Sequence, residues 1–525
     1  MLPSPPSIVL TTLNAKYIHA SLGLRYLLAN MTRHGSTDLR ARTVLREFTI
    51  ARPVAEIVDE LLATLGEATD DTRQIVGFGV YIWNTQQTTE VIRQLKARRP
   101  NLKIILGGPE VSYEWEDQEI VRLADHLITG WGDISFPKLC QALLHGPQPL
   151  MKVIPGEQAA MEEIELPYAE YSASDLAHRL LYVEASRGCP FKCEFCLSAL
   201  DKTAWAFELE RVLAALDGLY QRGARNFKFV DRTFNLKIDS SLAILKFFLD
   251  RLSPELFLHF EVIPDHLPDR LKEMIARFPP GVLQFEVGIQ TFDPVVQQRI
   301  SRRQDNDKTC ANLSWLVSES HAHLHTDLIF GLPGETLAGF ATGFDRLYAL
   351  QAHEIQLGVL KRLRGTPIAR HSAEYGMVYD SQPPYTIIQT GAVDAAGVAR
   401  FTRLARYWDL VANSGRFKQT LPILLAGNSA FAAFLAFSDW LWQTTEKTSG
   451  LTPENLVDHL FAYLTDQLGL VPDTVRAALL ADYLASGARA NPACLNGLLK
   501  GREQPVARNE RALTERQGRH VSVSG

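Results

Sequence analysis

The residues best suited to chemistry are three cysteines within eight consecutive positions, Cys189, Cys193 and Cys196, in a chain that has only six cysteines. Three thiols this close cannot all pair with one another in unstrained disulfides, so they are typical of ligands to one metal centre. Their spacing differs from the CxxC pairs of zinc sites, and no fourth cysteine or nearby histidine completes a tetrahedron. An iron-sulfur cluster held by three cysteines keeps one iron open for an outside ligand. The sequence therefore predicts such a cluster.

The cysteine loop lies in a region, residues 179–372, where strand and helix patterns alternate. Predicted strands cover residues 181–185, 227–230, 256–262, 282–289, 324–330 and 354–359. Six strand-helix units favour a (β/α)6 partial TIM barrel, whose chemistry lies at the carboxyl ends of the strands. Asp231, Glu261, Gln290 and Asp327 fall at or near those ends. Alone they could be scattered loop residues, but the cysteine loop at the same edge favours one shared site.

Residues 1–146 show a second alternation, with predicted strands at 7–13, 75–83, 103–106 and 126–129. This pattern predicts an α/β, doubly wound (Rossmann or flavodoxin-like), mostly parallel sheet. Glycines follow its strands at the edge where such sheets bind ligands, and they let the backbone approach a ligand closely: Gly107, Gly108, Gly130 and Gly132. Ordinary turns explain these glycines equally well. His19 begins the first helix beside the same edge, where it either touches a ligand or serves in packing or capping.

The other segments are less informative. Residues 147–178 are rich in proline and read as a linker, whereas residues 373–500 favour a mainly helical domain. Thr452 before Pro453 is a good helix start. One apolar stripe follows and is expected to pack in a core: Val457, Leu460, Phe461, Leu464 and Leu468. The polar residues 501–525 favour a disordered tail.

The composition is that of an ordinary globular protein, with 46% hydrophobic and 22% charged residues in 525. A net charge of −5 gives no reason to expect a nucleic-acid or anionic-membrane partner. Few cysteines in a long chain favour a reducing, cytoplasmic location, and the N-terminus lacks the basic region of a signal peptide. The most apolar segment, 421–442, contains Pro422 and Gly427 and favours a buried helix pair over a membrane span.

The motif Cys189-xxx-Cys193-x-Phe-Cys196 resembles the signature of the radical S-adenosylmethionine (SAM) superfamily. The resemblance implies a [4Fe-4S] cluster whose open iron is chelated by the amino and carboxylate groups of SAM. It also implies reductive cleavage of SAM to a 5′-deoxyadenosyl radical. The later strands resemble the branch that includes oxygen-independent coproporphyrinogen dehydrogenase, on residues 286–292, 300–304 and 327–336.

That likeness assigns the SAM-binding residues. It implies that Phe195 lies near the adenine, with Asp231 and Thr233 near the SAM amino group. The ribose hydroxyls and methionyl end of SAM would be held by Glu261, Gln290, Arg302 and Asp327. Arg303 competes with Arg302 for the same role.

The first domain resembles the cobalamin-binding domain of cobalamin-dependent radical SAM enzymes, on Gly-Gly-Pro109 and Gly-Trp-Gly-Asp133. Trp131 and Asp133 depart from the commoner Gly-Glu-Gly-Glu, and the Asp-x-His-x-x-Gly motif is absent. The resemblance therefore implies cobalamin with its own base displaced and no histidine on its lower face, near His19 and the four glycines. The C-terminal region resembles a domain of unassigned function found on some of these proteins.

Three functions fit these motifs. The first is a methyltransferase, in which the deoxyadenosyl radical activates an unactivated carbon and methylcobalamin donates a methyl group. The second is a cobalamin-bound radical enzyme that catalyses oxidation, ring rearrangement or cyclisation instead. The third is an electron-transfer or sensor iron-sulfur protein. The strand-end residues argue against this third function, because a simple redox cluster does not need them. The first two need a small-molecule or peptide substrate and an electron donor such as flavodoxin or ferredoxin.

Overall fold

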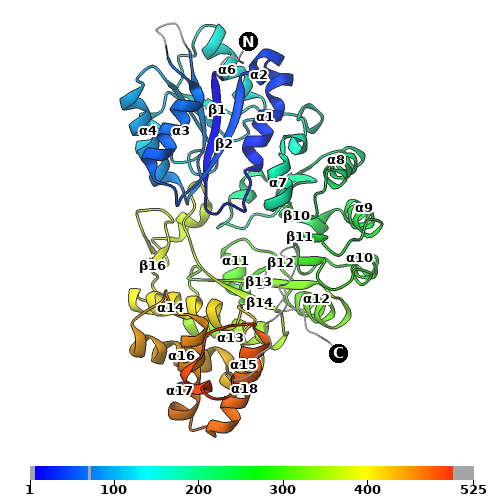
Figure 1. Cartoon of the computed structure of the whole chain (residues 1–525), viewed down its shortest axis with the longest axis vertical. Coiled ribbons are helices and arrows are strands. Elements are labelled where there is room, and N and C mark those ends of the chain that lie inside the picture. The colour runs from blue at the N-terminus through cyan, green and yellow to red at the C-terminus, as the bar shows by residue number, and fades with distance from the viewer. Residues whose placement is uncertain (1–5, 69–72, 500–525) are drawn as a thin grey trace. The chain divides into compact units, whose positions relative to one another are not determined.

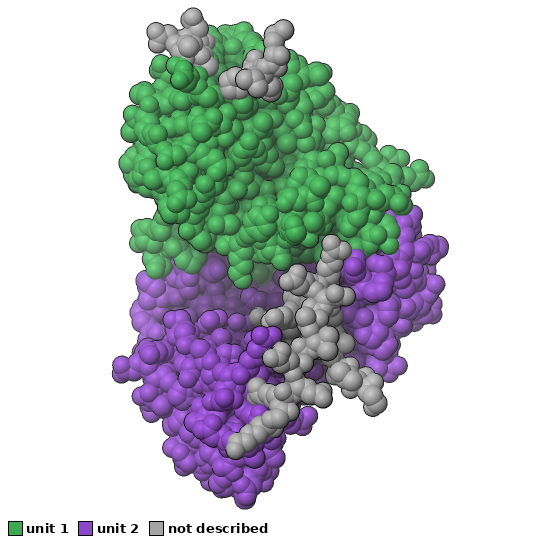
Figure 2. Space-filling model, viewed as in Figure 1, with its two compact units in different colours: residues 1–232, 362–367, 380–385 green, residues 233–361, 368–379, 386–525 purple. Residues whose placement is uncertain are grey.

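The computed structural model describes residues 6–68 and 73–499, and the expected tail at 501–525 lies outside these residues. The chain divides into two compact units, coloured separately in Figure 2. Unit 1 contains residues 1–232, 362–367 and 380–385, and unit 2 contains residues 233–361, 368–379 and 386–525. Unit 1 is therefore built from three separate stretches of chain, two of which are short and follow the first by more than 100 residues.

A six-stranded parallel sheet forms the first part of unit 1, in the order β2-β1-β3-β4-β5-β6. Its strands are β1 (Ile8–Asn14), β2 (Thr43–Thr49), β3 (Ile75–Gly79), β4 (Lys103–Gly107), β5 (His126–Thr129) and β6 (Val153–Pro155). This order is the flavodoxin-like one, with a topological switch between β1 and β3. The edge strands β2 and β6 were not among the predicted strands.

Helices cover both faces of this sheet, as Figure 1 shows. Its helices are α1 (Leu22–His34), α2 (Thr37–Ala41), α3 (Val54–Leu65), α4 (Thr85–Arg98), α5 (Glu119–Leu123) and α6 (Ser135–His145). One buried cluster joins α3, α4 and α5 to the strands, and another joins α1, α2 and α6 to them. Successive strand residues alternate between the clusters, as Val9 and Leu10 do, because side chains in a strand point to opposite faces. The doubly wound prediction is confirmed.

The strand predicted for residues 75–83 is too long, since β3 ends at Gly79. Asn84 explains the early end, because its side chain accepts a 2.9 Å hydrogen bond from the Tyr81 amide and donates a 3.0 Å bond to the Leu13 carbonyl. The Trp83 indole donates to the same carbonyl at 3.1 Å. These side-chain bonds replace strand pairing and turn the backbone into α4.

The segment expected to be a linker packs onto α1 through helix α7 (Ala173–His178). The Arg25 guanidinium is buried and lies 2.9 Å from carboxylate oxygens of both Asp175 and Glu47. Arg179 pairs with Glu47 at 2.7 Å. A buried charge is tolerated only with such partners, so this network fixes α7 against the first sheet.

The barrel strands follow, two in unit 1 and four in unit 2. In unit 1, β7 (Leu181–Val183) pairs in parallel with β10 (Asn226–Phe229). In unit 2, four strands pair in parallel in sequence order: β11 (Phe257–Val262), β12 (Leu283–Gln290), β13 (His323–Phe330) and β14 (Glu354–Val359). The intervening helices are α8 (Leu209–Gln221), α9 (Ile238–Leu249), α10 (Asp269–Ile275), α11 (Pro294–Arg299), α12 (Asn306–Glu319) and α13 (Leu337–Ala349). All six predicted barrel strands are present.

The C-terminal part of unit 2 is helical apart from the short pair β15 (Val378–Tyr379) and β16 (Ile387–Gln389). Its helices are α14 (Ala395–Val411), α15 (Thr420–Leu424), α16 (Ala430–Thr445), α17 (Pro453–Ala462) and α18 (Pro472–Ala485). Thr452 caps α17 as predicted. Leu468 is 46% exposed, contrary to the predicted stripe, because a π-helical turn at Tyr463–Gln467 shifts the helical phase before it. Within the described ranges, no helix is long and apolar enough to cross a membrane.

Candidate functional site

The cysteine loop, residues 189–196, follows the first strand of a two-stranded antiparallel stem. That stem pairs β8 (Ser186–Gly188) with β9 (Ala204–Ala206). Gly188 has a φ of +86°, and a Cβ there would collide with the Thr203 carbonyl, so this position requires glycine. Cys189 and Cys193 are buried, Cys196 is half-buried, and the Cys196 amide donates to the Cys193 carbonyl at 3.1 Å. Phe195 lies in the same loop and is half-buried.

Burial raises the pKa of the Cys189 thiol to about 11, although a backbone hydrogen bond from Phe191 opposes the shift. A bound metal reverses this preference, because coordination favours the thiolate. Among residues 6–68 and 73–499, no three His, Cys, Asp or Glu side chains are grouped as a single ion would require. Three cysteine thiolates on one loop are a ligand set typical of an iron-sulfur cluster.

Asp231, just after β10, is hydrogen-bonded to the chain that leads into the cysteine loop. Its carboxylate accepts from the Ala185 amide at 3.0 Å and from the Ser186 hydroxyl at 2.6 Å. Burial raises the pKa of Asp231 to about 7, and these hydrogen bonds oppose that shift. Asp231 therefore orients the start of the stem.

In unit 2, Gln290 ends β12 at a β-bulge and has a φ of +68°. Its side chain folds back over Gly288, where a Cβ would collide with the Gln290 amide nitrogen. Gln290 Oε1 is buried and has no hydrogen-bond partner in the part of the chain that the structure describes. Arg302 donates to the Gly288 carbonyl and, at 3.0 Å, to Gln304 Oε1. Bulges re-aim side chains next to active sites, and here one presents an unsatisfied amide oxygen.

The neighbouring strands of unit 2 position the other residues expected to bind SAM. Asp327 is in register with Gly288, and its carboxylate lies 3.8 Å from His325 Nε2. Glu261 is in register with Glu286, one strand away. Thr233 Oγ1 is buried and has no hydrogen-bond partner in the described ranges. The structure thus brings Gln290, Arg302 and Asp327 together around β12, while the cysteines, Phe195 and Asp231 belong to unit 1.

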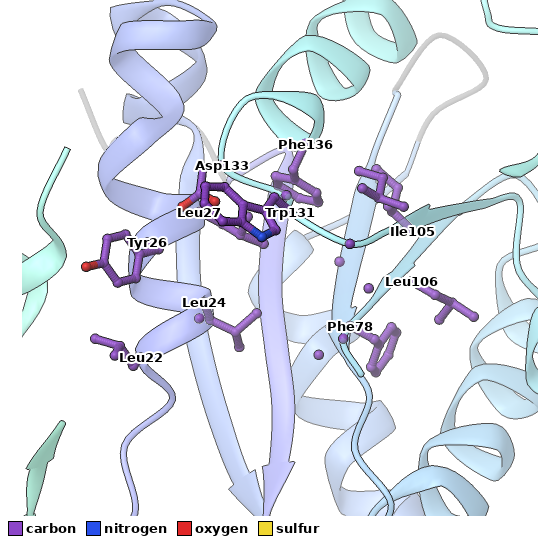
Figure 3. Close-up of a pocket in the computed structure, with 18 of the residues that line it drawn as sticks. Leu22, Leu24, Tyr26, Leu27, Phe78, Ile105, Leu106, Trp131, Asp133 and Phe136 are labelled. Atoms are coloured by element: carbon purple, nitrogen blue, oxygen red, sulfur yellow. The ribbon is translucent and has the colours of Figure 1, made fainter. Parts of the chain in front are cut away.

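A cavity of about 340 Å³ lies in the first domain, between α1, the ends of β3 to β5 and the loop after β5. All four predicted glycines line it, together with apolar side chains from α1 and the strands, several of which Figure 3 shows around the cavity. His19 does not line it. The Tyr182 hydroxyl lies 2.7 Å from His19 Nδ1, and burial, helped by Lys228 and Lys16, lowers the pKa of His19.

The two glycine loops, residues 107–108 and 130–133, are joined by Ser112. Its hydroxyl donates to the Gly108 carbonyl at 2.8 Å and accepts from the Gly130 amide at 3.1 Å. Gly108 has a φ of +110°, and a Cβ there would collide with the Val80 backbone. A Cβ at Gly107 would meet nothing closer than 3.8 Å, so the absence of this side chain widens the space beside the cavity.

Three charged residues line the cavity, Asp133, Glu184 and Arg187, and none of them was predicted as a site residue. Arg187 Nη1 lies 2.8 Å from one Asp133 oxygen, while the buried Asp133 Oδ1 has no hydrogen-bond partner within residues 6–68 and 73–499. Arg187 also pairs with Glu184 at 2.9 Å, and its guanidinium lies over the rings of Tyr26 and Trp131. The sequence signal that could have identified Arg187 as a site residue is its position two residues before Cys189.

Glu335, after β13, is a further buried carboxyl group that the sequence reasoning did not single out. It accepts a hydrogen bond from the Thr291 hydroxyl at 3.1 Å, and backbone hydrogen bonds from Leu332 and Gly331 also favour its ionised form. Burial raises the pKa of Glu335 to about 8, so the carboxyl group is mostly protonated at neutral pH. The hydrogen bond from Thr291 to Glu335 links the segments that follow β12 and β13.

The residues present fit the three expected cofactors. Three thiols on one loop suit an iron-sulfur cluster. The unsatisfied oxygens of Gln290 and Thr233 suit a ligand with amino and hydroxyl groups, as SAM has. An apolar cavity with a glycine edge and one unsatisfied carboxylate oxygen suits a large ligand with a flat apolar part and a hydrogen-bond donor, as cobalamin is.

Family comparisons match three parts of the chain. Residues 8–140 match the B12 binding domain, residues 183–345 match the radical SAM superfamily, and residues 373–517 match a protein of unknown function, DUF4080. These matches follow one another without overlap.

Two curated relatives are methyltransferases. The 2-(S-pantetheinyl)-carbapenam-3-carboxylate methyltransferase of Streptantibioticus cattleyicolor is 24% identical over 53% of this chain and 45% of its own length. The cobalamin-dependent radical SAM methyltransferase TokK of Streptomyces tokunonensis is 23% identical over 59% of this chain and 49% of its own length. The chain thus spans about half the length of the curated relatives it matches.

Two solved structures share the fold. The cobalamin-dependent S-adenosylmethionine radical enzyme OxsB, with aqua-cobalamin bound, has a TM-score of 0.60 at 14% identity and covers 92% of this chain and 81% of its own. The radical SAM methyltransferase TsrM of Kitasatospora setae, with cobalamin and a [4Fe-4S] cluster bound, has a TM-score of 0.57 at 16% identity and covers 74% and 82%. The family matches thus identify a radical SAM superfamily domain at residues 183–345, preceded by a B12 binding domain and followed by a domain of unknown function, and the two solved structures share this fold.

Proposed function

We propose that this chain is a cobalamin-dependent radical SAM enzyme that methylates an unactivated carbon of a small-molecule or peptide substrate. The observation that carries the proposal is the combination, within unit 1, of a glycine-edged cavity and a three-cysteine loop whose stem contributes Arg187 to that cavity. The similarity to two methyltransferases supports methyl transfer over other radical chemistry.

The chain's own residues would have distinct tasks. Cys189, Cys193 and Cys196 would hold the cluster, and Asp231 would fix the entry to their loop. Gln290, Arg302 and Asp327 would bind SAM together with Glu261 and Thr233, and Phe195 would lie near its adenine. When bound, the cofactors would supply a 5′-deoxyadenosyl radical and a methyl group. The protein would supply orientation and exclusion of water.

The cavity would hold part of cobalamin along the four glycines, whose missing side chains allow close approach. His19 is turned toward Tyr182 and does not line the cavity, which supports a cobalamin without a histidine ligand from this position. The proposal includes a reducing cytoplasmic location and an electron donor such as flavodoxin or ferredoxin.

Anaerobic reconstitution with iron, sulfide, cobalamin, SAM and a reductant tests this function. We expect 5′-deoxyadenosine and S-adenosylhomocysteine to form, and labelled methyl from SAM to appear on cobalamin. Cys193→Ala should abolish the cluster signal, whereas the matched control Cys310→Ala, in α12, should keep it. Deoxyadenosine without methyl transfer would favour oxidation, ring rearrangement or cyclisation. A reducible cluster with neither product would favour electron transfer or sensing.

A further inference from the structure

Arg187 joins the cysteine-loop stem to the cavity in the first domain. It lies in the middle of β8, in register with Trp205 of β9, and two residues before Cys189. Its Nη1 reaches Asp133 at 2.8 Å, and its Nη2 and Nε reach Glu184 at 2.9 and 3.2 Å. A planar guanidinium can span two carboxylates in this way, which an ammonium group cannot do with the same geometry.

Aromatic contacts reinforce the connection. The Arg187 guanidinium lies 4.6 Å from the ring centre of Tyr26 on α1 and 4.9 Å from that of Trp131 after β5. The Trp131 ring also meets Trp205 edge-on, with 6.3 Å between ring centres. Both strands of the stem therefore contact the loop at residues 130–133, which lines the cavity.

The backbone on both sides of Arg187 is constrained, so it has little freedom to absorb a movement of this residue. Gly188 is held at a φ of +86° against the Thr203 carbonyl, and Ser186 is hydrogen-bonded to Asp231. A displacement of Arg187 would therefore be passed to Cys189 instead of being lost in a flexible joint.

The cavity also contains an atom through which a ligand could act on Arg187. Asp133 Oδ1 is buried, lacks a hydrogen-bond partner among the described residues and belongs to the carboxylate that pairs with Arg187. A hydrogen-bond donor on a bound ligand would satisfy this oxygen and fix the carboxylate, and with it the guanidinium.

From this geometry we infer that Arg187 is a positioning residue that couples ligand binding in the cavity to the arrangement of the cysteine loop. The inference rests on the proposed function, since it takes cobalamin as the ligand and a cluster on the cysteines. Coupling between two sites is reciprocal, so the cluster must strengthen cobalamin binding by the same factor as cobalamin stabilises the cluster site.

Binding measurements on the full chain, without turnover, test this coupling. We expect hydroxocobalamin to bind at least about fivefold more tightly to the cluster-loaded chain than to the cluster-free chain, and to change the electron paramagnetic resonance spectrum of the reduced cluster. In Arg187→Met both effects should disappear, while Arg187→Lys should restore them in part. Arg225→Met is the matched control, because Arg225 also lies over an aromatic ring, that of Tyr220, away from the cavity, and it should keep both effects.

Arg187→Met leaves Asp133 and Glu184 without their cation and could prevent folding. Asp133→Asn therefore serves as a second variant, which removes the charge at the cavity end without altering the stem, and it should reduce the coupling factor. The inference would be overturned if Asp133→Asn and Arg187→Lys both retained the cluster and showed the same coupling factor as the unsubstituted chain. It would also be overturned if the unsubstituted chain bound hydroxocobalamin equally tightly with and without the cluster. Absence of any cobalamin binding would contradict the proposed function as well. Coupled binding without methyl transfer would contradict that function alone.

Discussion

The Tyr385 hydroxyl donates a 2.5 Å hydrogen bond to Glu110, a residue 275 positions earlier in the chain. Glu110 follows the glycines after β4 and is buried. Arg364 completes the cluster, 3.0 Å from the same Glu110 oxygen and 2.9 Å from the Tyr385 hydroxyl. Two short later segments of unit 1, residues 362–367 and 380–385, thus contact the loop after β4, which borders the cavity.

Removing this hydroxyl should destabilise unit 1. Tyr385→Phe leaves the buried Glu110 with Arg364 as its remaining partner in the cluster, so we expect a loss of about 1–3 kcal/mol in the free energy of unfolding. Urea unfolding followed by circular dichroism measures it. Tyr348→Phe, in α13 of unit 2, is the control and should leave the unfolding of unit 1 unchanged. Equal stability of Tyr385→Phe and the unsubstituted chain would contradict this role.

Glu335 should make stability depend on pH. Its pKa is raised to about 8 in the folded state, so the folded protein holds one more proton than the unfolded chain between about pH 4.5 and pH 8. The contribution of Glu335 is therefore complete at low pH and is lost as the pH rises toward 8. Between these two pH values, Glu335 lowers the free energy of unfolding by about 1.4 kcal/mol for each unit of rise in pH.

Glu335→Gln should remove this slope from unfolding curves measured between pH 5.5 and 8.5. The exposed Glu319→Gln, at the end of α12, is the control and should retain it. Identical slopes in both variants would show that Glu335 ionises normally.

The two adjacent glycines at the end of β4, Gly107 and Gly108, should respond differently to alanine. Gly108→Ala places a Cβ against the Val80 backbone at a positive φ, and we expect it to lower the free energy of unfolding by at least about 2 kcal/mol. Gly107→Ala meets no atom within 3.8 Å and should fold normally, yet its methyl group narrows the cavity edge and should weaken hydroxocobalamin binding. Thermal unfolding and equilibrium binding distinguish the two effects. Unaltered binding by Gly107→Ala would exclude this edge from the cobalamin site.

Gln290 should illustrate a conflict between stability and binding. Because its φ is +68°, Gln290→Gly relieves backbone strain and should leave stability within about 1 kcal/mol, while SAM affinity falls with the loss of the amide oxygen. Gln290→Ala should lose affinity to the same degree and be the less stable of the two, because alanine retains the strain. Isothermal titration with SAM gives the affinities, and full affinity in Gln290→Gly would remove this residue from the SAM site.

Local patterns in the sequence were sufficient for the main architecture. The six barrel strands, four of the six strands of the first sheet and the four cavity glycines each have a signal within a few residues, and the structure contains them all. Strand β2 was missed because its residues Thr43–Thr49 carry Arg46 and Glu47 among apolar side chains, and Glu47 is buried only through its arginine partners.

Long-range pairings explain most of what remained hidden. Arg187 with Asp133, and Tyr385 with Glu110, join positions whose local sequence contains no sign of the partner. The left-handed backbone at Gln290 is equally unreadable, because glutamine does not signal a positive φ and the bulge depends on pairing with β13.

The composition of unit 1 from three separate stretches has a consequence for dissecting the protein. A fragment ending at residue 232 would contain the whole first sheet and the cysteine loop, yet it would lack Arg364 and Tyr385. Glu110 would then be a buried carboxylate without these two partners, beside the loop that borders the cavity. No single backbone cut can therefore release this unit intact, and cofactor binding is best studied in the undivided chain.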